Sequence, residues 1–178
     1  MNDTFPWILF LVISVLLIVF TGWFSIIKKR YHGIPRFFAF ECIAALVLLN
    51  LHPWFRNIFS WNQVISWILL FWATLFAVIG FYQLESRGKP QGDFENTSKL
   101  VTSGIYHWIR HPLYASLFIL GFGISFKEIT FLNYTLAILN AAGMFFTATI
   151  EEREMIAKFG EDYNIYMKNS WMFIPYLI

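Results

Sequence analysis

PLYASLFILGFGISFKEITFLNYTLAILNAAGMFFTATI, from Pro112 to Ile150, holds two apolar runs separated by the short polar break KEIT. The runs cover 112–126 and 131–150, and so short a break favours two antiparallel helices. As a helix the first run would rise about 22 Å, less than the ~30 Å hydrocarbon core of a bilayer. The stretch therefore predicts a helical hairpin whose first arm need not cross a membrane completely.

A hairpin brings the start of its first helix beside the end of its second, so we expect His111 and Glu151 to be neighbours. Pro112 suits the first turn of a helix, and the residue before a proline is pushed toward an extended backbone. The first turn also offers N–H groups and a partial positive charge to an anion. The hairpin thus predicts a polar site at one of its ends.

Composition places this hairpin in a membrane protein. Of the 178 residues 58% are hydrophobic and 13% charged, and the mean hydropathy is +0.57, which is outside the range of ordinary soluble domains. Three further apolar runs precede the hairpin, at 5–27, 37–51 and 61–82. We therefore predict an all-α, multi-pass membrane protein with about five transmembrane helices at 5–27, 37–51, 61–82, 112–126 and 131–150.

The polar segments outside these runs are expected on one aqueous side. Residues 83–111 form a connector rich in turn-forming residues, and 151–178 carry mixed charge with apolar residues at helical spacing, as in an amphipathic helix. Eleven of the 13 Lys and Arg residues flank one side, leaving only Arg56 and Lys127 on the other. This asymmetry predicts a single membrane domain, 1–178, whose connector and tail face the cytoplasm.

Several classes of function find no support in the chain. A single cysteine, Cys42, excludes an intrachain disulfide or a CxxC metal site. His107 and His111 are four residues apart, but Pro112 interrupts a common helical face, so we expect no metal. The basic residues are too few and scattered for nucleic-acid binding. The chain also lacks the GxSxG, GxxxxGK[ST] and GxGxxG motifs.

The polar residues taken alone leave alternatives open. Arg110 and His111 also fit an ordinary basic flank of a membrane helix. Glu151 and Glu152 end a predicted helix, where acidic groups oppose the helix dipole, and they therefore call for a cationic partner. Glu41 lies inside a predicted span, where it either reaches the interface or serves a function. A nonenzymatic membrane subunit or a small transporter is the alternative outside the enzymes.

Several blocks match a known family in order and spacing. They are LVTSGIYHWIRHPLY at 100–114, EE at 151–152, FGEDYNIYM at 159–167, and Pro175. In these the chain resembles the integral membrane methyltransferases of the isoprenylcysteine carboxyl methyltransferase and phospholipid methyltransferase group, over about Gln91 to Pro175.

The resemblance implies an enzyme that binds S-adenosyl-L-methionine without a Rossmann domain, in a pocket formed by connector, hairpin and tail. It implies Glu151 and His111 as catalytic residues. It also implies a lipophilic or amphiphilic methyl acceptor reached from the membrane lipid. The residues that match the family's cofactor pattern are Gln91, Ser98, Lys99, Leu100, Val101, Tyr106, His111, Pro112, Leu113, Tyr114 and Glu151.

One departure concerns the acceptor. In the isoprenylcysteine enzymes an arginine commonly stands one helical turn before the first Glu of the EE pair, whereas this chain has Thr147. A hydroxyl cannot replace a bidentate guanidinium, so a carboxylate acceptor requires another cation, such as Arg110 or Arg153. With Thr147, Glu152 and Arg110 expected on the substrate side, a phospholipid amine or a small thiol is the alternative to a carboxylate.

Overall fold

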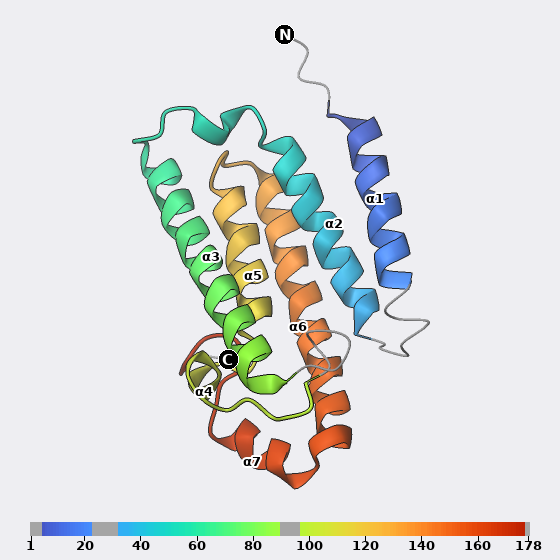
Figure 1. Cartoon of the computed structure of the whole chain (residues 1–178). Helices are drawn as coiled ribbons and strands as arrows, with labels where there is room; N and C mark the ends of the chain where they lie inside the picture. The colour runs from blue at the N-terminus through green and yellow to red at the C-terminus, as the bar shows by residue number, and fades with distance from the viewer. Residues whose placement is uncertain (1–4, 23–31, 90–96, 177–178) are drawn as a thin grey trace. The chain divides into compact units, whose positions relative to one another are not determined.

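The computed structural model describes residues 5–22, 32–89 and 97–176, and these residues are helical without any named strand (Figure 1). One isolated parallel bridge pairs Ile109 with Trp171. The predicted all-α class is confirmed for this part of the chain. The helices are α1 (Trp7–Gly22), α2 (Gly33–Leu49), the 3-10 helix η2 (Pro53–Phe55), α3 (Trp61–Gly88), α4 (Ile105–Trp108), α5 (Pro112–Ser125), α6 (Phe131–Phe159) and α7 (Glu161–Lys168).

The chain divides into two compact units. The first unit comprises residues 1–71 and 118–147, and the second comprises 72–117 and 148–178. The boundaries fall within α3, α5 and α6, so each unit holds part of these three helices. The residues of the predicted polar site, apart from Thr147, belong to the second unit.

Small residues and buried polar groups join the helices of the first unit. Gly143 of α6 lies so close to α2 that an added Cβ would stand 2.8 Å from the Cβ of Ala39. Asn140, one turn earlier, donates from Nδ2 to the carbonyl of Ala39 at 3.2 Å. Ser14 of α1 donates to Glu41 of α2 at 2.8 Å. Such close contacts and interhelical hydrogen bonds are the usual means of holding membrane helices together.

The hairpin loop holds a buried lysine that the sequence pattern did not predict. Lys127 is 2% exposed, and its Nζ donates to Oε1 of Gln63 at 3.1 Å. The same Nζ lies 3.5 Å from the ring centroid of Trp67. A cation over an indole ring is attracted by the ring quadrupole. The aromatic face therefore replaces part of the hydration that the lysine ammonium loses on burial.

Three helix boundaries in the described residues differ from the prediction by more than two residues. The second helix begins at Gly33 and not at 37, because Pro35 lies in its first turn, where a proline costs no hydrogen bond. The third continues to Gly88 instead of ending at 82, since its polar end is exposed and the backbone still pairs internally. Helix α6, predicted to end at 150, continues to Phe159. It ends before Gly160, which has a φ of +60°.

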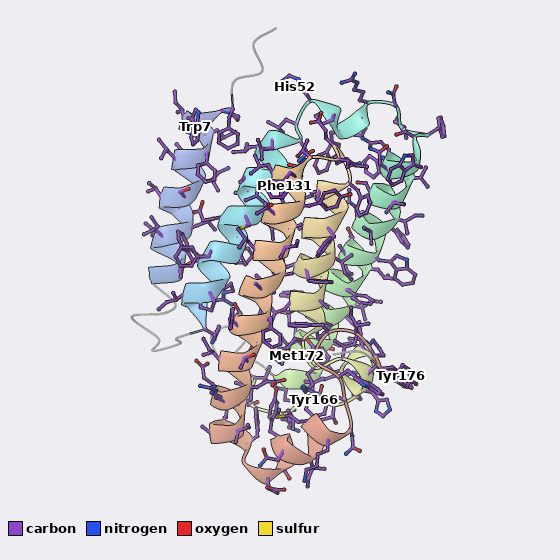
Figure 2. The ribbon with its side chains drawn as sticks, turned by 180° about the vertical axis from the view of Figure 1, so that it is seen from behind. Trp7, His52, Phe131, Tyr166, Met172 and Tyr176 are labelled. Atoms are coloured by element: carbon purple, nitrogen blue, oxygen red, sulfur yellow. The ribbon has the colours of Figure 1, made fainter. Side chains whose placement is uncertain are left out.

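Within the described ranges, two helices, α3 and α6, are long and apolar enough to cross a bilayer. The apolar helices α1 and α5 are shorter, although the run predicted at 5–27 extends past Gly22 into residues outside the described part. Trp7 and Ile8 of α1 are 65% and 82% exposed, as lipid-facing residues would be (Figure 2). The predicted count of five membrane helices stays a prediction.

Candidate active site

The C-terminal segment is joined to the chain just before α5 by backbone hydrogen bonds. The N–H of Arg110 donates to the carbonyl of Trp171 at 2.8 Å, and that of His111 to Met172 at 3.1 Å. Trp171 donates in turn to the carbonyl of Trp108 at 3.0 Å. Ile109 has an extended backbone, with a φ of −129° and a ψ of 123°, and forms the bridge to Trp171 where 108–111 pair with the tail, beside α4 (Figure 1).

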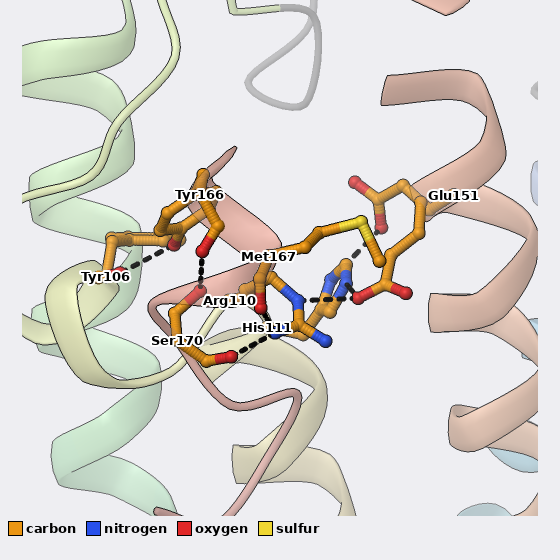
Figure 3. Close-up of polar contacts among 8 residues, drawn as sticks. Tyr106, Arg110, His111, Glu151, Tyr166, Met167 and Ser170 are labelled. Atoms are coloured by element: carbon orange, nitrogen blue, oxygen red, sulfur yellow. Dashed lines mark hydrogen bonds and ion pairs between the residues drawn. The ribbon is translucent and has the colours of Figure 1, made fainter. Parts of the chain in front are cut away.

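The side chain of Arg110 is turned inward and bound on two of its nitrogens. Its Nε donates to Oε1 of Glu152 at 2.7 Å, and both side chains are less than a tenth exposed. Its Nη1 donates to the carbonyls of Met167, at 3.2 Å, and Ser170 (Figure 3). Arg110, two residues before α5, therefore connects this part of the chain with α6 and with the tail.

The ring of His111 lies between two carboxylates. Nε2 is 3.3 Å from Oε1 of Glu152, and Nδ1 is 3.7 Å from Oε2 of Glu151 (Figure 3). The ring also stacks on Tyr114, with centroids 5.5 Å apart. The predicted meeting of His111 and Glu151 is confirmed as geometry.

The two adjacent glutamates differ in their surroundings. Glu152 is buried and receives Arg110 and His111 on the same oxygen. Glu151 has a side chain that is 18% exposed, and the contact that joins it to this cluster is the longer one with His111. Glu152 is thus occupied by the protein's own cations, whereas Glu151 keeps capacity for a further donor.

The hydroxyls of two buried tyrosines near the cluster, Tyr106 and Tyr166, bind backbone carbonyls. Tyr166 of α7 donates to the backbone carbonyl of Tyr106 at 2.6 Å, and the hydroxyl of Tyr106 donates to the carbonyl of Gly80 at 3.2 Å. Burial is the main cause that raises the pKa of both phenols. They therefore remain neutral donors and hold α4 between α3 and α7.

The connector is attached to α3 and α6 at several points. The side chain of Gln83 accepts the N–H of Ile105 at 2.9 Å, and Gly104, with a φ of +70°, leaves room for it. Lys158 of α6 donates to the carbonyl of Thr97 at 2.7 Å. These bonds hold residues 97–105 of the connector against α3 and α6.

The predicted cofactor residues fall into three groups. Tyr106, His111, Tyr114 and Glu151 lie in or beside the cluster described above. Pro112 and Leu113 pack against Gly80 of α3, and Val101 is buried. Ser98 and Lys99 are exposed and bind the end of α3 through the carbonyls of Lys89 and Gly88, with Leu100 half-buried beside them. Gln91 lies outside the described residues.

The expected substrate residues are placed differently from one another. Arg110 and Glu152 pair with each other. Thr147 is fully buried, belongs to the first unit, and donates to the carbonyl of Gly143 at 2.7 Å. The sequence pattern gave no sign of Gln83, Ser170 or the carbonyl of Met167, because each acts through a bond to a distant segment.

The described residues hold no group of three His, Cys, Asp or Glu side chains that could bind a metal ion. The cluster around His111 presents carboxylate oxygens, aromatic rings and the first turn of a helix, which are groups that can bind an organic ligand.

Comparison with known proteins gives the site a chemical context. The family model described as phospholipid methyltransferase matches residues 61–162, more than half of the chain. A protein-S-isoprenylcysteine O-methyltransferase of Xenopus laevis is 35% identical over 92 residues, which cover 49% of this chain and 31% of that protein. The human protein-S-isoprenylcysteine O-methyltransferase is 34% identical over the same length.

A second kind of relative transfers methyl groups to sulfur. The methanethiol S-methyltransferase of Mycobacterium tuberculosis is 28% identical over 131 residues, 65% of this chain and 50% of that protein. The chain thus spans between about a third and a half of the length of these relatives. No solved structure matches it.

Proposed function

This chain belongs to the phospholipid methyltransferase family, and from that premise we propose that it is a membrane-embedded methyltransferase dependent on S-adenosyl-L-methionine. Its acceptor is an amphiphilic or apolar molecule, as in an isoprenylcysteine carboxyl methyltransferase-like enzyme. The observation that carries the proposal is the position of His111 between Glu151 and Glu152, next to the first turn of α5. These three residues lie within the part of the chain that the family model matches.

The residues present suit the methyl donor, which carries an ammonium, a carboxylate and a sulfonium. The 14-residue α5 presents the positive end of its dipole and its first turn to a carboxylate. Glu151 offers carboxylate oxygens to a cation, and Tyr114 offers an aromatic face. The described part of the site thus contains a partner for each charged group.

The chemistry asks mainly for positioning. The bound donor supplies an electrophilic methyl group, so holding an acceptor in line with it provides much of the acceleration. The stacked rings of His111 and Tyr114 line the site. Glu152, which is bound by Arg110, orients the ring of His111. Glu151 faces the reacting groups and compensates their positive charge.

The membrane arrangement is part of the proposal. Five helices cross or enter the bilayer at the positions of α1, α2, α3, α5 and α6, and the connector and tail face the cytoplasm. The support is the concentration of eleven of 13 Lys and Arg residues on that side. Exposed apolar side chains along α1 and α3 agree with contact to lipid.

The relatives' names give two acceptor chemistries, O-methylation of an isoprenylcysteine protein and S-methylation of methanethiol. A phospholipid amine is the third acceptor that the family name suggests. Thr147, at the place of an arginine in isoprenylcysteine enzymes, weakens the case for a carboxylate, because its hydroxyl is bonded to Gly143.

Isothermal titration of the full chain in lipid nanodiscs with S-adenosylhomocysteine tests the proposal. We expect saturable binding that His111→Ala or Glu151→Ala weakens at least about tenfold, as for the loss of a charge-assisted hydrogen bond. His107→Ala is the matched control, because His107 is exposed on the neighbouring helix α4. Absence of binding at millimolar ligand would exclude the proposed function.

A further inference from the structure

The second unit contains one buried cationic side chain. All seven of its Lys and Arg residues lie in the described part of the chain, and six of them are exposed. Only Arg110 has its charged group turned inward, with a side chain 9% exposed. A substrate carboxylate held within this unit would therefore have Arg110 as its natural partner. The exposed six are Arg87, Lys89, Lys99, Arg153, Lys158 and Lys168.

Arg110 is already engaged by the protein. Its Nε is bound to Glu152 and its Nη1 to the carbonyls of Met167 and Ser170. A guanidinium binds a carboxylate bidentately through two neighbouring nitrogens. Every such pair on Arg110 includes Nε or Nη1, so capture of a substrate carboxylate would require the release of Glu152 or of the tail.

The cluster holds two carboxylates and one arginine, with the ring of His111 between the carboxylates. Arg110 pairs with Glu152, and the ion pair that Glu151 makes within the cluster is the 3.7 Å one between its Oε2 and Nδ1 of His111. That ring has a carboxylate oxygen near each nitrogen and can donate to both only when both nitrogens carry a proton. A carboxylate acceptor beside Glu151 would be repelled, whereas a neutral acceptor would not be and could pass its proton to Glu151.

Resting on the function proposed above, we propose that the methyl acceptor is an uncharged thiol and that Glu151 takes up its proton. The S–H bond breaks and the proton passes to a carboxylate oxygen of Glu151. The electron pair on the acceptor sulfur forms the new bond to the methyl carbon. The bond between that carbon and the donor's sulfonium breaks, and its electron pair stays on the donor sulfur, so a thioether and S-adenosylhomocysteine result.

The exposure of Glu151 suits this role. Its side chain is 18% exposed, so the proton can pass on to water after each turnover, which the more deeply buried Glu152 does not permit. A protonated amine would bring a second positive charge to the sulfonium and must lose a proton before it can react. A thiol enters neutral, and sulfur is an intrinsically strong nucleophile.

The first experiment compares three probes with the full chain in nanodiscs and methyl-labelled S-adenosylmethionine. The probes are 1-hexanethiol, N-acetyl-S-farnesylcysteine as the carboxylate, and phosphatidylethanolamine as the amine. We expect label in hexyl methyl sulfide, stable to alkali. Without the methyl donor, we expect quenching of tryptophan fluorescence to show tighter binding of hexyl methyl sulfide than of hexanoate.

The outcomes separate this inference from the proposed function. Base-labile label from the farnesylcysteine probe, label in the lipid amine without label in the thiol, or tighter binding of hexanoate would overturn the thiol acceptor. Binding of S-adenosylhomocysteine with no labelling of the thiol would also overturn it and leave the proposed function in place. Only a failure to bind S-adenosylhomocysteine would remove both.

The second experiment tests Glu151 itself with Glu151→Gln, which keeps the size of the side chain but cannot take up a proton. We expect kcat for hexanethiol to fall about 10²-fold, as for loss of a general base. The kcat is measured at saturating S-adenosylmethionine, so that weaker binding of the donor, which we expect from the role of Glu151 in holding it, does not enter the comparison. The control is Glu161→Gln, an exposed carboxylate of α7. Unchanged kcat in Glu151→Gln would exclude Glu151 as the proton acceptor.

Discussion

Nε of Arg110 donates to Oε1 of Glu152 at 2.7 Å, which joins the residue two before α5 to the C-terminal part of α6. Through the carbonyls of Met167 and Ser170 the same guanidinium also holds the tail. The pair therefore supports the site from behind, while the neighbouring Glu151 remains open to a ligand. A sequence block that looks like a basic flank is in fact a junction of three segments.

Breaking this pair should destabilise the protein. Arg110→Met leaves Glu152 buried without its guanidinium, and we expect the free energy of unfolding to fall by about 3–5 kcal/mol. Denaturant unfolding of the full chain in detergent measures this change. Arg153→Met, on the exposed residue that follows Glu152, should stay within about 0.5 kcal/mol of the wild type. A loss below about 1 kcal/mol in Arg110→Met would show that the pair is not a structural junction.

The connector should depend on a glycine for two reasons. Gly104 has a φ of +70°, and an added Cβ would stand 2.1 Å from Oε1 of Gln83. Gly104→Ala therefore adds backbone strain of about 1–3 kcal/mol and also displaces the bond from Ile105 to Gln83. We expect the Kd of S-adenosylhomocysteine to rise about tenfold.

The matched control is Gly160→Ala, because Gly160 has a similar φ of +60° but no atom within 4 Å of an added Cβ. It should lose similar stability and keep the wild-type Kd within about twofold. If both variants bind S-adenosylhomocysteine equally well, the path of the connector does not shape the cofactor site.

Lys158 should hold the connector for cofactor binding. Its Nζ donates to the carbonyl of Thr97 at 2.7 Å, and Lys158→Met removes this bond. We expect a Kd for S-adenosylhomocysteine about 3–10-fold higher, with Lys158→Arg retaining part of the affinity. Calorimetric titration provides the measurement, and Lys168→Met, on an exposed residue of α7, serves as the control. Equal affinities in Lys158→Met and the wild type would contradict this role.

The contact between α2 and α6 should not tolerate a larger residue. In Gly143→Ala the new Cβ would stand 2.8 Å from the Cβ of Ala39 and 3.1 Å from the carbonyl oxygen of Pro35. Because backbone cannot move aside as a flexible side chain can, we expect a loss of about 1–3 kcal/mol in unfolding free energy. Gly22→Ala, with nothing within 4 Å of its added Cβ, should not lower stability. Similar stability of the two variants would show that the contact is loose.

Much of the fold was accessible from local pattern. The apolar runs predicted the helices at 61–82, 112–126 and 131–150, and the structure has helices there, two of them longer. The predicted C-terminal ends of α3 and α6 were wrong because polar residues continue these helices into solvent. Hydropathy indicates burial and does not indicate backbone hydrogen bonding. The break at Gly160 depends on a single positive φ, which no periodicity reveals.

The amino-acid sequence by itself determined the helical class, the hairpin, the meeting of His111 with Glu151, and membership of the family. Hairpin topology sufficed for that meeting, because a short link between two helices leaves one antiparallel solution. Only the tertiary structure decided that Glu152 pairs with Arg110 whereas Glu151 does not, and that Arg110 also binds backbone carbonyls of the tail. Its bonds reach residues 42 to 60 positions away, and pairings over such distances depend on how whole segments pack.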